Sequence, residues 1–306
     1  MMENNTTYHI PVLLNECIEG LNINPDGIYV DVTFGGGGHS RHIFSKLSPK
    51  GKLIVFDQDP DAKNNVWEAD NLHFIPSNFS FLSNHLLALG VRKVDGILAD
   101  LGVSSHQFDE GNRGFSFRSN APLDMRMNQR SEKSAKSIVN TYEEQELIRI
   151  FREFGELNQA RRIAQAIVLE RGYKSIDTTF ELCEVLQHLA PKFKDFKFFA
   201  QVFQAIRIEV NEELKVLEKL LLDSAELLAD NGRLVVMSYH SLEDRLVKNF
   251  LKHGSFDGKE EKDFFGNLIK PLREINRHPI VPNENEMELN SRARSVRLRI
   301  AERNER

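Results

Sequence analysis

Four consecutive glycines occupy residues 35–38, between a short apolar run and the start of a helical pattern. Because glycine has no Cβ, the backbone can turn sharply there and a ligand can approach the bare peptide. A second apolar run, residues 53–56, leads into Asp57. This carboxylate follows the glycines by about 20 residues, the spacing at which doubly wound α/β proteins hold a ribose diol. The two features together favour a nucleoside-binding loop over a flexible connection without a ligand.

The glycine loop departs from the fingerprint of dinucleotide-binding proteins, which is G-x-G-x-x-G. Gly35 and Gly37 fit the first two positions, but Ser40 stands at the third. His39, Ser40 and Arg41 also crowd the helix start, where a pyrophosphate needs open backbone N–H groups. The loop therefore favours a cofactor with a ribose and no phosphate, such as S-adenosylmethionine. A nicotinamide-dependent oxidoreductase remains an alternative.

Polar residues follow two further strand patterns. Asp100 ends the run at residues 96–99, and Tyr239 and His240 follow the run at residues 233–237. In open α/β sheets, ligands bind outside the carboxyl ends of the strands. We therefore interpret Asp100 as a carboxylate directed at an amine of the cofactor or substrate, with a loop-capping aspartate as the alternative. Tyr239 and His240 are expected to be exposed, to stack on a base and to accept a proton or contact a phosphate.

Ser241 and Asp244, which follow Tyr239, have a structural interpretation. Ser241 and Asp244 have the spacing of a capping box, so Ser241 is expected to begin a helix. No histidines have the spacing of metal ligands on one helix face, and Cys17 and Cys183 are the only cysteines. The sequence thus predicts neither a metal site nor a disulfide framework, and a reducing cytoplasm is the expected compartment. No signal peptide or membrane-spanning run is expected.

The charge distribution is uneven. The net charge of −5 over 306 residues argues against a basic nucleic-acid coat protein. Cations nevertheless gather at residues 113–136 and 292–299. Such runs of cations usually form solvent-exposed surface, and local contact with phosphates is the alternative.

Helix and strand patterns alternate through the first hundred residues, which predicts an α/β fold with a parallel sheet covered by helices on both faces. The strands are expected near residues 29–32, 53–57, 72–75 and 96–100, with helices near 12–21, 39–47 and 81–89. Helices are then expected at 144–154, 160–170, 179–189 and 211–228, and strands at 233–237 and 296–300, after a stop at 230–232. We predict a first domain part at 1–108, a helical insertion at 109–211 and a second domain part at 212–306.

Several segments resemble the bacterial small-subunit ribosomal RNA methyltransferase H family in the same order. They are HIPVLL at 9–14, TFGGGGHS at 33–40, DLGVSS at 100–105, RGFSF at 113–117, PLDMRM at 122–127, FQAIRI at 203–208 with VN at 210–211, HSLEDR at 240–245, SRARS at 291–295 and LR at 298–299. The resemblance implies a Rossmann-like S-adenosylmethionine-dependent methyltransferase fold with an inserted helical domain for RNA recognition. It implies methyl transfer to the exocyclic N4 of a cytidine in the decoding centre of 16S rRNA. The small ribosomal subunit is the expected form of this substrate, and free rRNA is the alternative.

The resemblance also implies site residues. Cofactor contacts are expected at Gly37, Gly38, His39, Asp57, Phe79, Asp100 and Gln107. Phe79 would pack on adenine and Asp57 would accept the ribose hydroxyls. Asp100 is the first candidate to accept a hydrogen bond from the attacking amine, and Tyr239 and His240 are the other catalytic candidates. The arginines at positions 113, 118, 126 and 292–299 are expected to include contacts with flanking phosphates, among them Arg113, Arg118 and Arg126.

Four positions depart from the family pattern. Val32 replaces a smaller residue, His106 a proline and Tyr239 a phenylalanine. The family also has an arginine close to the position of Gln201, which this chain lacks. The change at Gln201 is expected to affect RNA binding by the insertion. A non-catalytic RNA-binding assembly factor on the same fold is the alternative function, although the intact cofactor positions argue against it.

Overall fold

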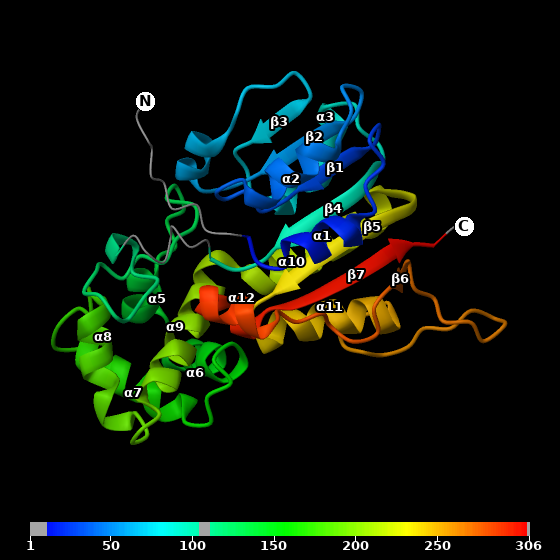
Figure 1. Cartoon of the computed structure of the whole chain (residues 1–306). Coiled ribbons are helices and arrows are strands. Elements are labelled where there is room, and N and C mark those ends of the chain that lie inside the picture. Colours follow the sequence, from blue (N-terminus) through cyan, green and yellow to red (C-terminus); the bar gives the residue numbers. More distant parts are fainter. Residues whose placement is uncertain (1–10, 104–110, 305–306) are drawn as a thin grey trace, which may run out of the picture. The chain divides into compact units, whose positions relative to one another are not determined.

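The computed structural model describes residues 11–103 and 111–304, which form two compact units. The first unit combines residues 1–102 with 214–306, and the second comprises residues 103–213. In Figure 1 the first unit runs from blue to cyan and from yellow to red, and the second is mainly green. The insertion expected at 109–211 falls within the second unit.

The first unit is built on a seven-stranded sheet of order β3-β2-β1-β4-β5-β7-β6 (Figure 1). The predicted parallel pairing is confirmed for β1 to β5, whereas β7 pairs antiparallel with both β5 and β6. The strands are β1 Ile28–Asp31, β2 Lys52–Phe56, β3 Leu72–Ile75, β4 Val94–Asp100, β5 Leu228–Ser238, β6 Leu272–Glu274 and β7 Arg297–Arg303. The chain order reverses between β1 and β4, and in such sheets this switch point is where a ligand binds.

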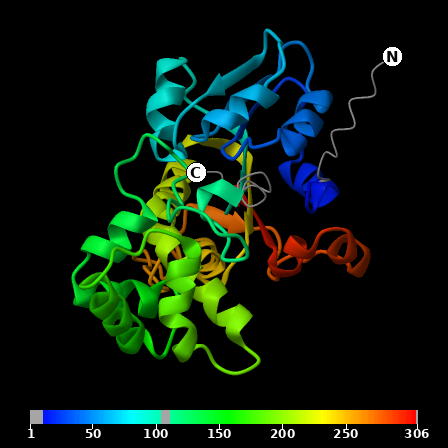
Figure 2. The same ribbon diagram turned by 90° about the vertical axis from the view of Figure 1, so that its left-hand side faces the viewer.

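Helices cover both faces of the sheet, as predicted (Figures 1 and 2). Alternate strand residues point to opposite faces, so Tyr29 and Val30 belong to different buried clusters. The Tyr29 cluster includes residues of α1 Leu14–Leu21 and α2 Gly38–Lys46, and the Val30 cluster includes residues of α3 Leu82–Ala88, α10 Glu213–Leu227 and α11 Ser241–His253. Shorter elements of this unit are η1 Pro60–Asn65, η2 Phe79–Phe81, α12 Glu284–Leu289 and η5 Ser291–Ser295. No helix in the described ranges is long and apolar enough to span a membrane.

The stop expected at residues 230–232 is wrong, because these residues lie within β5. The preceding helix α10 ends at Leu227, and β5 begins at the next residue. Asn231 adopts a left-handed φ of 63°, and the register against β4 shifts between Val94 and Gly96. Residues 230–232 thus form a bulge, which inserts extra residues into the strand without ending it.

The second unit is helical. The helices predicted at 144–154, 160–170 and 179–189 are confirmed, whereas α5 and α9 were not predicted as separate helices. Glu212, with a φ of 51°, ends α9 just before α10 begins. The elements are η3 Gly111–Arg113, α5 Ala135–Thr141, α6 Glu144–Glu153, α7 Ala160–Arg171, α8 Thr179–Leu186, η4 Gln187–Leu189 and α9 Asp195–Asn211.

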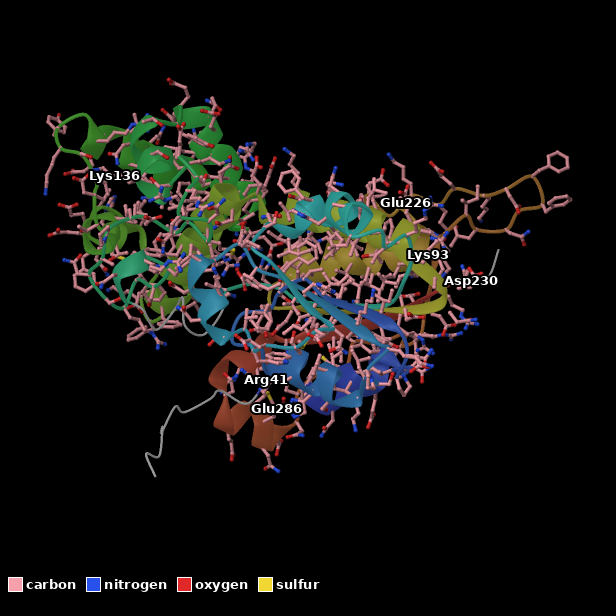
Figure 3. The ribbon with its side chains drawn as sticks, turned by 90° about the horizontal axis from the view of Figure 1, so that it is seen from above. Arg41, Lys93, Lys136, Glu226, Asp230 and Glu286 are labelled. Carbon is pink, nitrogen blue, oxygen red and sulfur yellow. The ribbon has the colours of Figure 1, made fainter. Side chains whose placement is uncertain are left out.

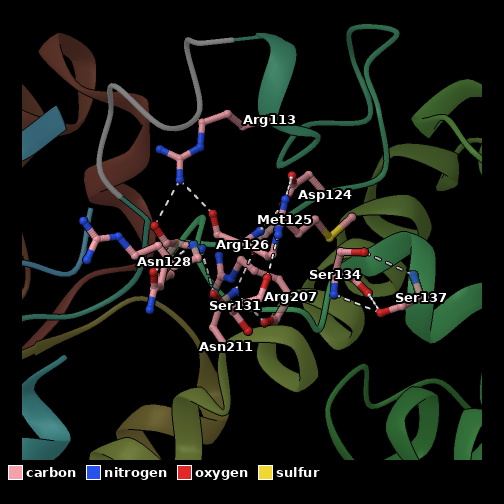
Figure 4. Close-up of polar contacts among 12 residues, drawn as sticks. Arg113, Asp124, Met125, Arg126, Asn128, Ser131, Ser134, Ser137, Arg207 and Asn211 are labelled. Atoms are coloured by element: carbon pink, nitrogen blue, oxygen red, sulfur yellow. Dashed lines mark hydrogen bonds and ion pairs between the residues drawn. The ribbon is translucent and has the colours of Figure 1, made fainter. Parts of the chain in front are cut away.

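The end of α9 organises the irregular segment before α5 (Figure 4). The Asn211 side chain accepts a hydrogen bond from the Met127 N–H at 2.8 Å and donates one to the Met125 carbonyl, also at 2.8 Å. Met125 has a left-handed φ of 56°, which these two bonds hold in place. Two segments that carry the family resemblance, 122–127 and 203–211, are therefore joined through one amide side chain.

Candidate active site

The glycine loop after β1 is packed on one side and open on the other. Gly37 has a φ of +75° and precedes α2, a conformation that favours glycine. A Cβ on Gly38 would lie 2.4 Å from Cγ of Pro11, so only hydrogen fits there. A Cβ on Gly36 would meet no described atom within 4 Å. The backbone at Gly36 therefore borders open space in which a ligand can approach it.

Asp57 follows β2 and closes over the same loop. Its Oδ2 accepts a 2.7 Å hydrogen bond from the Gly35 N–H, and its Oδ1 accepts a 2.8 Å bond from the Asp59 N–H. Burial raises the pKa of this carboxyl to about 6, against the lowering effect of the two N–H donors. Each oxygen keeps a second lone pair, and two such acceptors match the vicinal hydroxyls of a ribose.

Phe79 begins η2, just after β3, and is partly buried against the cluster that contains Val30. The preceding Asn78 donates a 2.8 Å hydrogen bond from Nδ2 to Oε1 of Gln58, the residue after Asp57. Asn78 also caps η2 by accepting from the Ser80 N–H. The segments after β2 and β3 are thereby joined, and they carry a carboxylate and an aromatic ring at the carboxyl ends of two neighbouring strands.

Asp100 ends β4, where it meets residues from β5 and α2. Oδ1 accepts a 2.7 Å hydrogen bond from the Tyr239 hydroxyl, and Oδ2 lies 3.8 Å from Nδ1 of His39. The His39 Nε2 lies 3.0 Å from the Val12 carbonyl, which only accepts, so Nε2 carries a hydrogen. The sequence-predicted residues His39, Asp100 and Tyr239 thus lie together, with His39 buried and the other two partly buried.

The charges of this group are set by burial and by its partners. Burial raises the pKa of the Asp100 carboxyl, while His39 and the Tyr239 hydrogen bond lower it. Burial and the nearby Asp100 raise the pKa of Tyr239 well above its ordinary value. Tyr239 therefore remains a protonated donor and Asp100 the acceptor.

Three residues that were not predicted as site residues form hydrogen bonds with this group or with one another. Thr33 Oγ1 accepts a 2.7 Å hydrogen bond from the Asp100 N–H. Asp31, 1% exposed, accepts bonds from Ser40 Oγ at 2.6 Å and from the Thr33 N–H at 3.0 Å. An aspartate inside an apolar strand run was the available sequence signal, because a buried carboxylate requires donors.

Tyr239 and His240 are half-buried and not exposed as expected, and the helix begins at Ser241 as expected but is capped by His240 instead of by a Ser241 capping box. His240 itself caps α11, since its Nδ1 accepts from the Glu243 N–H at 3.4 Å. Its Nε2 lies 3.3 Å from Oε1 of Glu243, whose Oε2 accepts a 2.8 Å bond from the Tyr239 N–H. Glu243 is only 2% exposed, so this cap is enclosed. The described contacts of the His240 ring are with α11 and not with Asp100.

Several arginines expected at phosphates have internal partners in the second unit (Figure 4). Arg113 is 7% exposed and donates to the carbonyls of Arg126 and Met127 at 2.7 and 3.1 Å. Arg126 forms two 2.7 Å bonds to Asp124 and a 2.6 Å bond to the Ser131 carbonyl. The phosphate role expected for Arg113 is wrong because that guanidinium is enclosed. Arg118 is exposed above the Phe196 ring, at 4.8 Å from its centroid.

The arginines at residues 294–299 likewise include both buried and exposed side chains. Arg299 is 4% exposed and donates a 2.7 Å bond from Nε to Asp244, so its expected phosphate contact is also wrong. Arg297 shares Asp244 at 3.2 Å, and Arg294 is exposed. On α2, the exposed Arg41 (Figure 3) lies 4.6 Å from the centroid of the Trp67 ring and donates to the Asn65 carbonyl.

The remaining sequence-based expectations fall elsewhere. Gln107 lies outside the described residues, as do Ser104 and His106. Gln201 donates a 2.9 Å bond to the Gly155 carbonyl and lines a hollow in the second unit together with Lys194 and Lys197. Gln201 therefore joins α9 to the end of α6, which gives this departure from the family pattern a structural role.

The residues at the carboxyl ends of β1, β2, β4 and β5 fit a nucleoside cofactor beside a substrate amine. The loop offers a glycine cradle open at Gly36, the Asp57 carboxylate lies on that loop, and Asp100 lies across the switch point between β1 and β4. The hydroxyl groups of Thr33, Ser40 and Tyr239 in this site donate to the carboxylates of Asp31 and Asp100. The arrangement is suited to binding and orientation of two ligands.

Comparisons with known proteins give a consistent result. The family model described as the MraW methylase family matches residues 6–304. A protein of Bacteroides thetaiotaomicron named Ribosomal RNA small subunit methyltransferase H is 53% identical over 302 residues, covering 99% of each chain. A protein of the same name from Cytophaga hutchinsonii is 55% identical over 298 residues, covering 97% of this chain and 99% of that one. A solved putative rRNA-methylase of Clostridium thermocellum aligns at 11% identity and a TM-score of 0.45, over 97% of this chain and 98% of that one.

Proposed function

Because this chain belongs to the MraW methylase family, we propose that it methylates the exocyclic N4 of a cytidine in the decoding centre of 16S rRNA. The chain is an S-adenosylmethionine-dependent methyltransferase of small-subunit ribosomal RNA, in keeping with relatives about half identical over almost their whole length. That the methylated atom is N4 of a cytidine is the part of the proposal that must be argued from the residues of the site.

The proposed cofactor contacts follow from the loop geometry. Gly37, with its φ of +75°, and Gly38, packed against Pro11, form the turn beside the open position at Gly36, and His39 lies in the first turn of α2. Asp57 would accept the ribose hydroxyls with the lone pairs left by Gly35 and Asp59. Phe79, next to the Asn78–Gln58 bond, would pack on the adenine. When bound there, S-adenosylmethionine supplies a methyl group on a positively charged sulfur.

The cytosine amine is a poor nucleophile because its lone pair is delocalised into the ring. As the nitrogen becomes tetrahedral, its hydrogens become more acidic and its positive charge grows. A fixed carboxylate that accepts one of these hydrogens stabilises the transition state more than the ground state. Asp100 is the candidate for this role, which is supported by the 2.7 Å hydrogen bond that holds Oδ1 and by the 3.8 Å distance from Oδ2 to His39 Nδ1, which leaves Oδ2 able to accept a hydrogen bond.

Three side chains would position Asp100. Tyr239 donates to Oδ1, Thr33 accepts from the Asp100 backbone N–H, and His39 adds a polar group at 3.8 Å. Such preorganisation removes the need to reorient the acceptor during the reaction. The target base would leave its stack to reach the site, as in other enzymes that modify bases.

The observation that carries the proposal is the oriented Asp100 carboxylate at the switch point of a methyltransferase-family sheet. Mass spectrometry of small-subunit rRNA from cells with and without this protein tests it. Loss of one N4-methylcytidine in the decoding centre is expected. Retention of every methylated cytidine in the deletion strain would contradict the proposed activity and favour the non-catalytic assembly factor.

We also propose that the substrate is the rRNA within the small ribosomal subunit. Purified protein would be incubated with labelled cofactor and either free 16S rRNA or assembled subunits that lack the modification. Faster incorporation into the subunits is the expected result, and a preference for free rRNA would contradict it.

A further inference from the structure

An arm extends from the first unit between α11 and β6 (orange in Figure 1, brown in Figure 3), and we define it as residues 255–270. Its base is anchored. Phe256 stacks on the buried Phe250 of α11, with centroids 5.1 Å apart and planes at 14°. Asn249 donates a 2.9 Å hydrogen bond to the Phe256 carbonyl. The arm therefore leaves the domain in a defined direction.

Two aromatic side chains occupy the tip of the arm and bury almost nothing in the described structure. Phe264 is 98% exposed and Phe265 is 83% exposed. Their centroids lie 5.6 Å apart and their planes are nearly perpendicular, at 86°. Phenylalanine is normally among the more buried residues, so two adjacent exposed rings mark an interaction site.

The tip is shaped by specific hydrogen bonds. The Asp263 carboxylate accepts from the Phe265 and Asn267 N–H groups at 2.9 and 2.8 Å, and the Asp263 N–H donates to the Asn267 carbonyl at 2.9 Å. Gly266 adopts a φ of +84° to close the turn. Below it, Lys262 and Leu268 form an antiparallel bridge. The two rings are thus presented by an ordered turn, which lowers the entropy lost on binding.

Basic residues are concentrated in the segments that flank the arm. Residues 245–254 and 271–277 contain five lysines and arginines and one acidic residue, whereas the arm itself contains three lysines and four acidic residues. On the arm, Lys259 and Lys262 have side chains 85% and 54% exposed and are paired with Asp257 and Glu260. The positive charge suited to an anionic partner therefore lies at the base of the arm.

We propose that Phe264 and Phe265 stack on unpaired bases of the rRNA substrate, with the basic residues at the base of the arm near the flanking phosphates. The inference rests on the proposed function for the identity of the RNA. Aromatic side chains bind single-stranded RNA by stacking on its bases, beside cations that follow the backbone. A pocket in a protein partner fits the tip less well, because beyond the two rings the arm adds one exposed large apolar side chain, Ile269 at 53%, which is little for the core of an interface.

The test compares the full-length chain with the double variant Phe264→Ala/Phe265→Ala. The probes are a single-stranded oligonucleotide from the decoding region of small-subunit rRNA and the same strand in a duplex. Stacking predicts about 10-fold weaker binding to the single strand, or more, and little change for the duplex. The slope of affinity against salt should stay unchanged, because no charge is removed. Leu87→Ala, which removes a 70% exposed apolar side chain from α3 of the first unit, is the control and should bind like the wild type.

A second variant separates stacking from general apolar contact. Phe264→Leu/Phe265→Leu keeps apolar bulk and loses the flat rings, so it should bind the single strand as weakly as the alanine variant. Wild-type binding by either double variant would overturn the proposal. Unchanged binding to naked RNA with weaker binding to the assembled subunit would also overturn it and assign the tip to a ribosomal protein.

Methyl transfer measured on the same preparations keeps this inference distinct from the proposed function. The alanine variant should show a raised KM for RNA and an unchanged kcat at saturating RNA. An inactive wild type would refute the proposed function, whereas an active wild type with equal KM in both proteins would refute only the role of the arm.

Discussion

The Tyr239 hydroxyl donates a 2.7 Å hydrogen bond to Oδ1 of Asp100 and so joins the carboxyl ends of the neighbouring strands β5 and β4. Burial alone would favour the protonated form of Asp100, and this bond favours the ionised form. Phenylalanine is the residue expected at position 239 from the family pattern. This chain therefore adds a donor to the acceptor on which the proposed chemistry depends.

Tyr239→Phe should shift the pH dependence of methyl transfer. Without the hydroxyl, the pKa of Asp100 rises further. Since the ionised form is the active one, activity is present above that pKa and is lost as pH falls through it. A hydrogen bond to a charged group contributes about 1.5–3 kcal/mol, which moves the acid limb of kcat/KM upward by about 1–2 pH units. An acid limb at the wild-type pH would remove Tyr239 from this role.

Gly36→Ala should leave folding intact and weaken cofactor binding. The added methyl group meets no described atom within 4 Å, and the φ of Gly36 is not in the left-handed region. The methyl group would instead enter the space assigned to the cofactor. Thermal unfolding should match the wild type while titration calorimetry gives an affinity for S-adenosylmethionine lower by about 10-fold, or 1.4 kcal/mol. Equal affinities would place the cofactor elsewhere.

Asp57→Ala should also weaken cofactor binding, because it removes charged hydrogen bonds to the ribose worth about 1.5–3 kcal/mol each. Asp70→Ala, at an exposed aspartate of the same unit, is the control. In the wild type, the carboxyl of Asp57 has a pKa of about 6. Affinity should therefore be full above that pH and decline as pH falls through it. A flat affinity between pH 5 and pH 8, roughly one unit or more on either side of this pKa, would contradict the ribose contact.

Arg299→Ala should affect the stability of the fold, whereas Arg294→Ala should affect the salt dependence of RNA binding. Arg299 is buried against Asp244, so its removal leaves a buried charge without this partner and should destabilise the fold by about 3–5 kcal/mol. Arg294 is exposed, and its loss should reduce the log–log salt slope of RNA binding by about 0.7 if it contacts one phosphate of a single strand. Melting temperature and RNA affinity at several salt concentrations separate the two. An unchanged salt slope for Arg294→Ala would assign that residue to solvated surface.

Much of the fold could be predicted from the sequence, because periodicity and glycine punctuation carry local information. The strand at residues 72–75 and the helices near 144 and 160 are confirmed within a few residues. The antiparallel strand β7 could be located but not oriented, since orientation depends on its long-range pairing with β5. Asn231 shows the limit of turn signals, because a left-handed residue serves a bulge as well as a turn.

The candidate site could be predicted less completely. Asp57 and Asp100 were identifiable because each ends an apolar run. The Thr33–Asp100 and Tyr239–Asp100 bonds join residues 67 and 139 positions apart, and no local pattern encodes them. The sequence could not separate Arg113 and Arg299 from exposed arginines, because a partner such as Asp244 lies on another element.

The central claim is that Asp100 accepts a hydrogen bond from the N4 amine during methyl transfer to rRNA. The most direct measurement compares wild type and Asp100→Asn by cofactor affinity, by kcat on small-subunit RNA and by mass spectrometry of the nucleosides formed. N4-methylcytidine from the wild type is predicted, with kcat in the variant reduced far more than cofactor affinity. Equal losses of affinity and kcat, or a methyl group on any other atom of the RNA, would contradict the account.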